Sequence, residues 1–381
     1  MTIGVAILGS TGSIGTSALR VLARHRDQFR VVALTAYDSA ELLERQARDT
    51  GADFVGLVRG ANPRNSASVG GSVGGVDCLV AAATHPGVQI VVNAVVGAAG
   101  LPATLAALDA GRRVALANKE TLVMAGDLVL DRARRGGGEI VPIDSEHSAV
   151  LQCVVGAAAG TLRRLILTAS GGPFRDWPVE RVSTATVEQA LNHPTWRMGR
   201  KVTVDSATLV NKALEVIEAH FLFGLGYDAI EVVVHPQSII HAMTEFADGS
   251  ILAQVGFPTM ELPILYALTH PRRLPDEGVT RFDPLAAGPL TFEPVRDDAF
   301  PAFRLGVMAG TRGGLAPAVF NAANEVAVDA FLDGRIAFGR ISETIRRVLD
   351  QHRDDEGPVL DLGTVLEADR QARLRAEAVC C

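Results

Sequence analysis

The chain contains few aromatic residues and few cysteines. Phe, Trp and Tyr together make up 5% of its 381 residues, and there are 4 cysteines, Cys78, Cys153, Cys380 and Cys381. Four cysteines do not provide a disulfide framework for a chain of this length, so we expect a reducing, cytoplasmic location. The shortage of aromatics, combined with abundant small and aliphatic residues, favours helices packed on parallel strands.

The chain also lacks an excess of basic residues and an uninterrupted apolar segment. Its formal net charge of −7 argues against a nucleic-acid partner. Residues 78–108 contain no Asp, Glu, Lys or Arg, but Pro86, Gly97 and Pro102 interrupt them. These breaks predict a strand, a glycine turn and a helix that has Pro102 near its first position, rather than a membrane span. The N-terminus lacks the basic region and the long apolar core of a signal peptide. We therefore expect neither a nucleic-acid nor a membrane partner.

The first 25 residues predict a dinucleotide-binding turn. An apolar strand runs into Gly9, Gly12 and Gly15, and an amphipathic helix follows. Glycines let the backbone approach a pyrophosphate, and the helix N-terminus supplies N–H groups and the positive end of a dipole. The spacing is G-x-x-G-x-x-G rather than G-x-G-x-x-G, so a tight strand–helix turn without a ligand is the alternative.

Strands and helices continue to alternate as far as residue 116, the pattern of a doubly wound parallel sheet. Ligands of such sheets bind at the carboxyl ends of the strands, where Lys119 lies; a solvated loop lysine is the alternative. Asp38 follows the second strand, where a carboxylate favours NAD over NADP. We expect strands at 30–34, 54–58, 88–92 and 113–116, helices at 40–48 and 101–110, and a loop at 60–75.

Two carboxylates, Asp144 and Glu146, follow a predicted strand that ends near residue 143. In an extended chain, side chains two residues apart point to the same side, where two anions need a cation between them. Glu215, on a predicted helix, supplies a third carboxylate. Oxygen donors without an accompanying Cys or His pattern suit a hard divalent cation such as Mg²⁺ or Mn²⁺. A solvated acidic turn is the alternative.

Residues 164–223 predict an anion-binding site. A strand at 164–169 ends at Ser170, and the two glycines that follow expose backbone N–H groups; a plain turn is the alternative. We expect a helix from Asp205 or Ser206, as its cap, to Phe223. Its first turns would carry Ser206, Asn211 and Lys212, where the dipole favours anions, although Lys212 and Glu215 could form a simple surface pair. The loop 192–201 carries Trp196, either as a lid over a ligand or packed on its own domain.

The remaining residues predict structural elements. We expect a strand at 230–234 and a hairpin of strands 239–245 and 251–255 that turns at Asp248 and Gly249. The proline-rich segment 270–301 is typical of a linker. Helices are expected at 321–332, 341–350 and 365–379, the last with Thr364 and Glu367 as a capping box. We find no catalytic pattern in these helices.

Eight segments, in order along nearly the whole chain, closely resemble the 1-deoxy-D-xylulose 5-phosphate reductoisomerase family. They are GSTGSIG (9–15), ANKE (117–120), PIDSEHSA (142–149), SGGPFR (170–175), NHPTWRMGRK (192–201), DSATLVNKALE (205–215), HPQSIIH (235–241) and NAANE (321–325). The resemblance implies a homodimeric oxidoreductase of the non-mevalonate isoprenoid pathway. Its members use NADPH and Mg²⁺ or Mn²⁺, with Co²⁺ as a further candidate, to convert the sugar phosphate 1-deoxy-D-xylulose 5-phosphate to 2-C-methyl-D-erythritol 4-phosphate.

The resemblance also implies an α/β architecture with three parts and a linker. An NADP-binding, Rossmann-like domain would span 1–144 and a central α/β catalytic domain, which binds metal and phosphate, 145–269. The linker would span 270–301 and a C-terminal helical domain 302–381. Two other classes are weighed against this reading: a metal-independent Rossmann dehydrogenase of another phosphorylated substrate, and a non-catalytic dinucleotide sensor.

By the same resemblance, individual residues have expected roles. The catalytic residues would be Lys119, Asp144, Glu146 and Glu215, of which the three carboxylates are the metal ligands. Substrate would contact Ser145, Ser170, His193, Trp196, Met198, Ser206, Asn211, Lys212 and His235. The cofactor would contact Thr11, Gly12, Ser13, Ile14, Ala36, Tyr37, Asp38, Ser39, Asn118, Glu120 and Gly199.

One departure from the family concerns the cofactor. Many members carry Gly, a basic residue and Asn near the 2′-phosphate, whereas this chain has Tyr37, Asp38 and Ser39. We therefore expect a smaller margin of NADPH over NADH than in relatives with a basic residue there.

Overall fold

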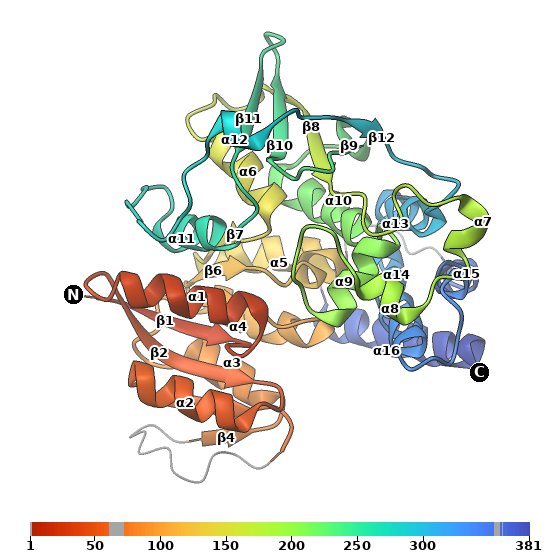
Figure 1. Ribbon diagram of the computed structural model, residues 1–381. Helices are drawn as coiled ribbons and strands as arrows, with labels where there is room; N and C mark the ends of the chain where they lie inside the picture. The colour runs from red at the N-terminus through yellow and green to blue at the C-terminus, as the bar shows by residue number, and fades with distance from the viewer. Residues whose placement is uncertain (1, 61–71, 354–358, 360) are drawn as a thin grey trace. The chain divides into compact units, whose positions relative to one another are not determined.

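The computed structural model describes residues 2–60, 72–353, 359 and 361–381. The chain forms two compact units, each assembled from separate segments (Figure 1). Unit 1 comprises Met1–Thr121, Val129–Ser148 and Thr259–Thr280, and unit 2 comprises Leu122–Leu128, Ala149–Pro258 and Arg281–Cys381. Neither unit is one continuous stretch of sequence. The domain boundaries expected at 144, 269 and 301 divide the chain into continuous segments, and they remain a proposal.

Unit 1 is built on a seven-stranded, fully parallel sheet with the order β4-β3-β2-β1-β5-β6-β7. Its central strands are almost entirely buried and apolar, as expected for strands covered on both faces. The expected doubly wound sheet is therefore confirmed. The strands are β1 (Ile3–Leu8), β2 (Phe29–Ala36), β3 (Phe54–Leu57), β4 (Ser72–Gly74), β5 (Ile90–Asn93), β6 (Arg113–Leu116) and β7 (Glu139–Pro142).

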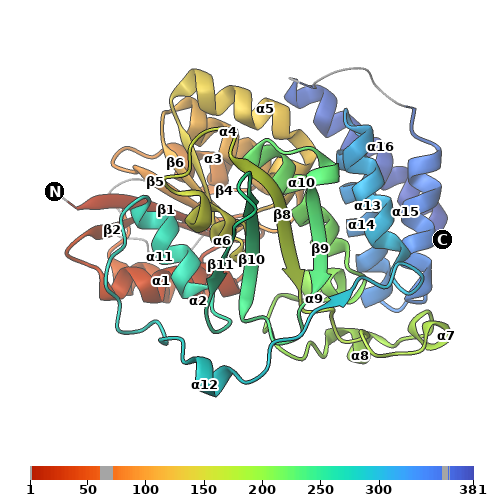
Figure 2. The same cartoon turned by 90° about the horizontal axis from the view of Figure 1, so that it is seen from above.

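Helices cover both faces of this sheet (Figure 2). Helix α1 packs on α11, and α3 packs on α4. Ion pairs reinforce this packing, since Arg24 of α1 binds Glu261 of α11 and Asp276 of the segment after α11 at 2.7 to 2.8 Å. The late segment 259–280 is thus an integral part of unit 1. The helices are α1 (Ser13–Arg24), α2 (Ala40–Thr50), α3 (Asp77–Thr84), the 3-10 turn η1 (Ala98–Gly100), α4 (Leu101–Asp109) and α11 (Glu261–Thr269).

Unit 2 contains a five-stranded mixed sheet with the order β11-β10-β8-β9-β12. Only the β8–β9 pair is parallel among its described pairings. Apolar side chains of β8, β9 and β10 pack with Val150, Val216 and Ala219 in one core. The strands are β8 (Leu162–Ala169), β9 (Ile230–Val234), β10 (Ile240–Phe246), β11 (Ile251–Val255) and β12 (Glu293–Pro294).

The C-terminal helices α13 to α16 of unit 2 pack around α14 and share a second core with α9 and α10 (Figure 2). Helices α5 (Glu120–Gly136) and α6 (Ser145–Val154) have residues in both units. The other elements are α7 (Val179–Val182), α8 (Val187–Leu191), α9 (Arg200–Ala207), α10 (Val210–Phe223), η2 (Tyr227–Ala229), α12 (Pro284–Ala287), α13 (Pro301–Arg312), α14 (Ala316–Leu332), α15 (Gly339–Asp350) and α16 (Leu362–Cys380).

The helix expected from residue 205 or 206 to 223 is wrong, because the structure has two helices there. Leu209 adopts the left-handed conformation, with φ of 58°, between α9 and α10. The Thr208 hydroxyl, at the C-cap of α9, donates to the carbonyl oxygens of Val204 and Asp205. Asp205 and Ser206 therefore lie in the last turn of α9 and are not caps.

Smaller differences concern helix starts. Residues 77–84 form a helix where the sequence predicted no element, and Pro102 lies at the start of α4 as expected. The Thr364–Glu367 capping box is also wrong, since Asp361 caps α16 through the Thr364 backbone and hydroxyl. Most of the loop expected at 60–75 lies outside the described residues. Among those described, no helix is long and apolar enough to cross a membrane.

Candidate active site

The turn between β1 and α1 requires glycine at two positions. Gly9 has φ of +84°, and a Cβ there would lie 2.7 Å from the Ala94 carbonyl oxygen. A Cβ on Gly15 would lie 2.3 Å from the Gly9 oxygen, so the helix starts in direct contact with the strand end. No side chain caps α1 at Gly12, which leaves first-turn N–H groups for an anion. The expected cofactor residues 11–14 are at least partly exposed in this turn.

The end of β2 holds the residues expected near the cofactor ribose. Ala36 is buried, whereas Tyr37, Asp38 and Ser39 are exposed. The neighbouring strand β3 ends beside them, because the backbone N–H of Arg59 donates to the Tyr37 carbonyl oxygen at 2.6 Å. A positive side chain therefore originates next to the exposed Asp38.

Asn118 holds the ends of two strands together. The buried Asn118 amide donates to the carbonyl oxygens of Val95 and Gly97 and to the Glu120 carboxylate, each at 2.9 Å. It also accepts from the Thr121 hydroxyl. The bonds to Val95 and Gly97 join the segment after β5 to the segment after β6, so Asn118 has a positioning role, and Glu120 in turn accepts from Asn118. Their direct contact with a cofactor remains a prediction.

Asp144 and Glu146 lie at the start of α6 rather than on extended chain, which corrects the expected geometry. The Ser148 N–H donates to the Asp144 carbonyl oxygen at 2.8 Å, as in the first turn of a helix. Lys119 Nζ lies 2.5 Å from Asp144 Oδ2, and the Ser145 hydroxyl donates to the Glu146 carboxylate. Unit 1 thus gathers Lys119, Asp144, Ser145 and Glu146 where β6 and β7 end, as expected for a ligand site of a parallel sheet.

In unit 2, His193 fixes the orientation of the Ser170 hydroxyl. His193 Nδ1 accepts hydrogen bonds from the backbone N–H groups of Thr195 and Trp196 at 3.1 and 2.9 Å. Burial lowers the pKa of His193 to about 4, so the ring is neutral and its one hydrogen is on Nε2. Nε2 therefore donates to Ser170 Oγ at 3.0 Å, and the Gly172 N–H donates to the same oxygen. Because the Ser170 oxygen accepts both of these bonds, its hydroxyl hydrogen can be donated to a ligand.

The turn after Ser170 packs on the end of α9. Gly171 and Gly172 both have positive φ, +83° and +66°. A Cβ on Gly172 would lie 2.6 Å from the Ser206 carbonyl oxygen, so the two backbones are in contact. Residues 170–172 and Ser206, which we call the anion nest, therefore come together although the sequence separates them.

The first turn of α10 carries Asn211 and Lys212. Both side chains donate to Glu215, as their i, i+4 and i, i+3 spacings on one face of the helix allow. Lys212 and Glu215 have side chains only 4% and 1% exposed. The Glu215 carboxylate is buried and accepts from both Lys212 and Asn211. The alternative of a solvated surface pair between Lys212 and Glu215 is therefore excluded.

Three other expected substrate contacts lie nearby in unit 2. Trp196 and Met198 are half-buried in the loop before α9, and the Trp196 ring lies 6.3 Å from the His241 ring. Gly199 is the exposed N-cap of α9. His235 is fully buried after β9, where Nδ1 bonds the Thr291 carbonyl oxygen and the ring stacks on Phe292. Its contact with substrate remains a prediction.

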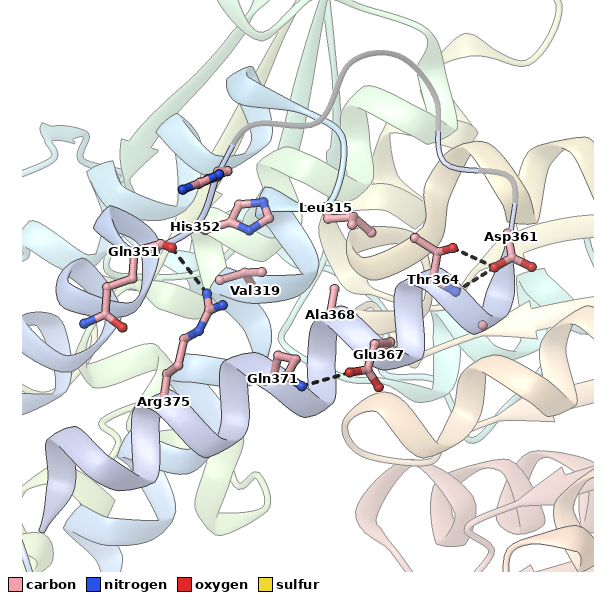
Figure 3. A pocket seen from close by; sticks show the side chains of 12 residues that line it. Leu315, Val319, Gln351, His352, Asp361, Thr364, Glu367, Ala368, Gln371 and Arg375 are labelled. Carbon is pink, nitrogen blue, oxygen red and sulfur yellow. Dashed lines mark hydrogen bonds between the residues drawn. The ribbon is translucent and has the colours of Figure 1, made fainter.

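A separate pocket among the C-terminal helices contains none of these residues. It has a volume of about 660 Å³, and its polar groups are largely committed to internal bonds, such as those of Asp361 with Thr364 and of Glu367 with Gln371 (Figure 3). Volume alone therefore does not locate the site in this chain.

Sequence reasoning missed a buried acid beside the anion nest. Asp205 was considered only as a cap, but it is 1% exposed and pairs with Lys201 and Asn324. The ion pair of Lys201 with Asp205 could have been predicted, because the two residues have i, i+4 spacing. The link to Asn324 had no local signal.

Three family models match the chain. The 1-deoxy-D-xylulose 5-phosphate reductoisomerase model matches residues 5–126, the model of that enzyme's C-terminal domain matches residues 140–223, and the DXP reductoisomerase C-terminal domain model matches residues 255–375.

Curated relatives are similar over nearly the whole chain. The 1-deoxy-D-xylulose 5-phosphate reductoisomerase of Citrifermentans bemidjiense is 50% identical over 380 residues, covering 98% of each chain. That of Synechococcus sp. (strain JA-2-3B'a(2-13)) is 48% identical over 384 residues, covering 97% of this chain and 95% of the relative.

Solved structures give the same result. The enzyme from Zymomonas mobilis in complex with NADPH is 40% identical and superposes with a TM-score of 0.90, covering 100% of this chain and 99% of the other. A DOX-P reductoisomerase in complex with NADPH, fosmidomycin and magnesium is 38% identical, with a TM-score of 0.90, and covers 99% and 98%. The chain described here therefore belongs to the 1-deoxy-D-xylulose 5-phosphate reductoisomerase family.

Proposed function

We infer that this chain catalyses the NADPH-dependent rearrangement and reduction of 1-deoxy-D-xylulose 5-phosphate to 2-C-methyl-D-erythritol 4-phosphate, in isoprenoid precursor synthesis. Family membership supports the reaction. The structural observation that carries it is the anion nest, in which a neutral His193 orients the Ser170 hydroxyl and the Gly172 backbone contacts that of Ser206. A sugar phosphate needs such a site, whereas a dehydrogenase of an uncharged substrate does not.

The substrate phosphate is bound by Ser170, Ser206, Asn211 and Lys212 in this proposal. Two hydroxyls and an amide donate hydrogen bonds, and the lysine supplies a full positive charge. Asn211 and Lys212 bond Glu215 in the structure, so they must exchange this partner for the phosphate. A cation that binds Glu215 makes that exchange easier, because the carboxylate no longer depends on the lysine. Metal and phosphate should therefore each strengthen binding of the other.

Asp144, Glu146 and Glu215 are proposed to bind a divalent metal ion, Mg²⁺ or Mn²⁺. Carboxylate oxygens suit a hard cation. In support of this proposal, Asp144 and Glu215 each form an ion pair with a lysine, Lys119 and Lys212 respectively. When bound, the ion polarises the ketone and the neighbouring hydroxyl of the substrate. Lys119, next to Asp144, is positioned to orient the carboxylate and to donate to a substrate oxygen.

NADPH is proposed to bind the turn after β1. The pyrophosphate would meet the N–H groups of α1 at residues 11–14, and the adenosine ribose would lie at residues 36–39. The loop 192–199 would cover the substrate. Because His193 joins the start of this loop to Ser170, a phosphate that fixes Ser170 also favours an ordered loop, which excludes water during hydride transfer.

The function is tested by following NADPH oxidation with 1-deoxy-D-xylulose 5-phosphate, with and without EDTA. We expect turnover that EDTA abolishes and added Mg²⁺ restores. Turnover that survives EDTA would favour a metal-independent dehydrogenase. Tight NADPH binding without turnover on this substrate would favour a non-catalytic sensor.

The chain is further proposed to form a homodimer through β11. This strand is at the edge of the unit 2 sheet, and its Ile251 and Leu252 are each 49% exposed. An unpaired edge with apolar side chains is a ready partner for a second copy. Light scattering should show a dimer at micromolar concentration, and Leu252→Lys should yield a monomer. Leu374→Lys, on the 50% exposed Leu374 of α16, is the matched control and should remain dimeric.

A cytoplasmic location is proposed from the cysteines. No disulfide joins the 4 cysteines, and burial raises the pKa of Cys78 to about 11, which makes its thiol less reactive. Cell fractionation tests this location.

A further inference from the structure

A buried polar cluster joins α9 to the C-terminal helices. Asp205, 1% exposed, lies one residue before Ser206. Its Oδ2 is 2.9 Å from Lys201 Nζ, and its Oδ1 accepts a hydrogen bond from Asn324 Nδ2 at 2.8 Å. Both carboxylate oxygens are therefore held, one from within α9 and one from α14. We call Lys201, Asp205 and Asn324 the α9 anchor.

The residue after Asn324 faces a different helix. Glu325 accepts from Asn321 at 3.0 Å and from Arg373 of α16 at 2.5 Å. The segment 321–325 thus joins α14 to α16 through Glu325 and to α9 through Asn324. This segment resembles a family motif, yet it supplies none of the expected contacts to substrate, metal or cofactor.

Helix α9 is short, so its position depends on contacts with other elements, the apolar core and the α9 anchor among them. It has eight residues, and no side chain caps its N-terminus at Gly199. A helix this short has little stability of its own. It follows directly on the loop that carries Trp196, and its other end contacts Gly172 through the Ser206 backbone. A small rotation or shift of α9 would therefore separate Ser206 from Gly172 and open the anion nest.

We propose that Asp205 is a positioning residue for the substrate phosphate: held by Lys201 and Asn324, it sets α9 so that Ser206 completes the anion nest. The C-terminal helices thereby raise the affinity for phosphate without touching the substrate. This inference rests on the proposed function, since it assigns the anion nest to the substrate phosphate.

Asn324→Leu tests the anchor with a side chain of similar size that cannot donate. We expect KM for 1-deoxy-D-xylulose 5-phosphate to rise about tenfold, the size typical for loss of a hydrogen bond to a charged group. The kcat at saturation and the Kd for NADPH should stay within about twofold of wild type, because the anchor touches neither reacting atoms nor cofactor. Glu325→Gln is the matched control. It weakens the neighbouring link to α16, so it should lower Tm and leave KM unchanged.

A charge swap separates positioning from general stability. Asn324→Asp alone places two carboxylates together and should raise KM further. Adding Asp205→Asn restores an amide–carboxylate pair of opposite direction and should recover most of the affinity. The same variants are titrated calorimetrically with inorganic phosphate, and their Kd should follow the same order. The Leu variant is checked by circular dichroism, and the swapped pair provides the test if that variant does not fold.

Two results would overturn the inference. One is an unchanged KM and phosphate Kd in folded Asn324→Leu. The other is a swap that restores Tm but not KM. Failure of the proposed function is a separate result, because it would show as absence of turnover in the wild-type enzyme, while the phosphate titrations would still test the anchor.

Discussion

Replacing Asp38 with asparagine should widen the preference for NADPH over NADH. Asp38 is exposed directly after β2, where the adenosine ribose of the proposed cofactor site would lie. A 2′-phosphate near this carboxylate is repelled by about 1 kcal/mol at 4 Å in water, and more where the dielectric is lower. One kcal/mol corresponds to about fivefold in affinity. We therefore expect Asp38→Asn to raise the NADPH:NADH ratio of kcat/KM about fivefold, and Asp38→Lys, which changes two charges, to raise it about thirtyfold.

Arg59 should act in the opposite direction. Its backbone N–H binds the Tyr37 carbonyl oxygen, so its side chain starts one strand away from the same ribose. A guanidinium suits a phosphate geometrically and electrostatically. Arg59→Ala should therefore lower the NADPH:NADH ratio about fivefold, by the same Coulomb estimate. Attraction of the 2′-phosphate by Arg59 would offset its repulsion by Asp38. The chain could then prefer NADPH without the basic residue that many relatives carry.

The measurement is kcat/KM for both cofactors at two salt concentrations, together with Kd of each cofactor from quenching of protein fluorescence. Salt should shrink the effect of each substitution, since exposed charges are screened over about 8 Å at physiological ionic strength. Asp49→Asn, an exposed acid at the far end of α2, is the control for net charge and should leave the ratio unchanged. A ratio unchanged in both Asp38 variants would refute the reasoning, because it would show that this side chain points away from the ribose.

Other predictions concern the substrate side. Glu215→Gln should abolish most turnover while the fold and NADPH binding persist, since glutamine is an equally good helix former; wild-type activity at saturating Mg²⁺ would refute the metal assignment. Lys212→Ala should raise the substrate KM strongly through loss of a charged phosphate contact, and a variant that still prefers the phosphorylated over the dephosphorylated substrate as wild type does would contradict it. The loop 192–201 should exchange amide hydrogens more slowly when a phosphonate inhibitor is bound; equal exchange with and without the inhibitor would exclude closure. Burial lowers the pKa of His193 to about 4, below its ordinary 6.5, so the stability that its neutral ring supplies is complete above pH 6.5 and is lost as the pH falls toward 4; an NMR titration with a midpoint near 6.5 would disprove this.

The parallel sheet of unit 1 could be predicted because its strands are buried on both faces. A run such as Ile3–Leu8 is continuously apolar and ends at glycines, and nothing distant is needed to specify it. The break at Leu209 could not be predicted in the same way. Apolar residues recur at helical spacing from Val210 to Phe221, and residues 205–223 contain no glycine or proline, so nothing local predicts the left-handed Leu209 that ends one helix and begins the next.

In the candidate site, too, contacts within one element could be predicted, whereas contacts between distant elements could not. Pairs on one helix, such as Asn211 with Glu215, follow from spacing alone. The contact of Gly172 with Ser206 and the bond from Asn324 to Asp205 depend on how distant elements pack. No local pattern contains that information, so the role of residues 321–325 became visible only in three dimensions.

The discontinuous make-up of unit 1 has a consequence for how the chain is made. Helix α11 and Asp276, which bind α1, are translated only after residues 149–258 of unit 2. At roughly 5–20 residues per second, the ribosome needs on the order of ten seconds to make that insertion. During this interval the cofactor-binding sheet is without the helix that covers α1, and Arg24 is without both of its carboxylate partners. The nascent chain must therefore wait for its own later segments before the first unit can close, and an N-terminal fragment that stops before residue 259 should be prone to aggregation.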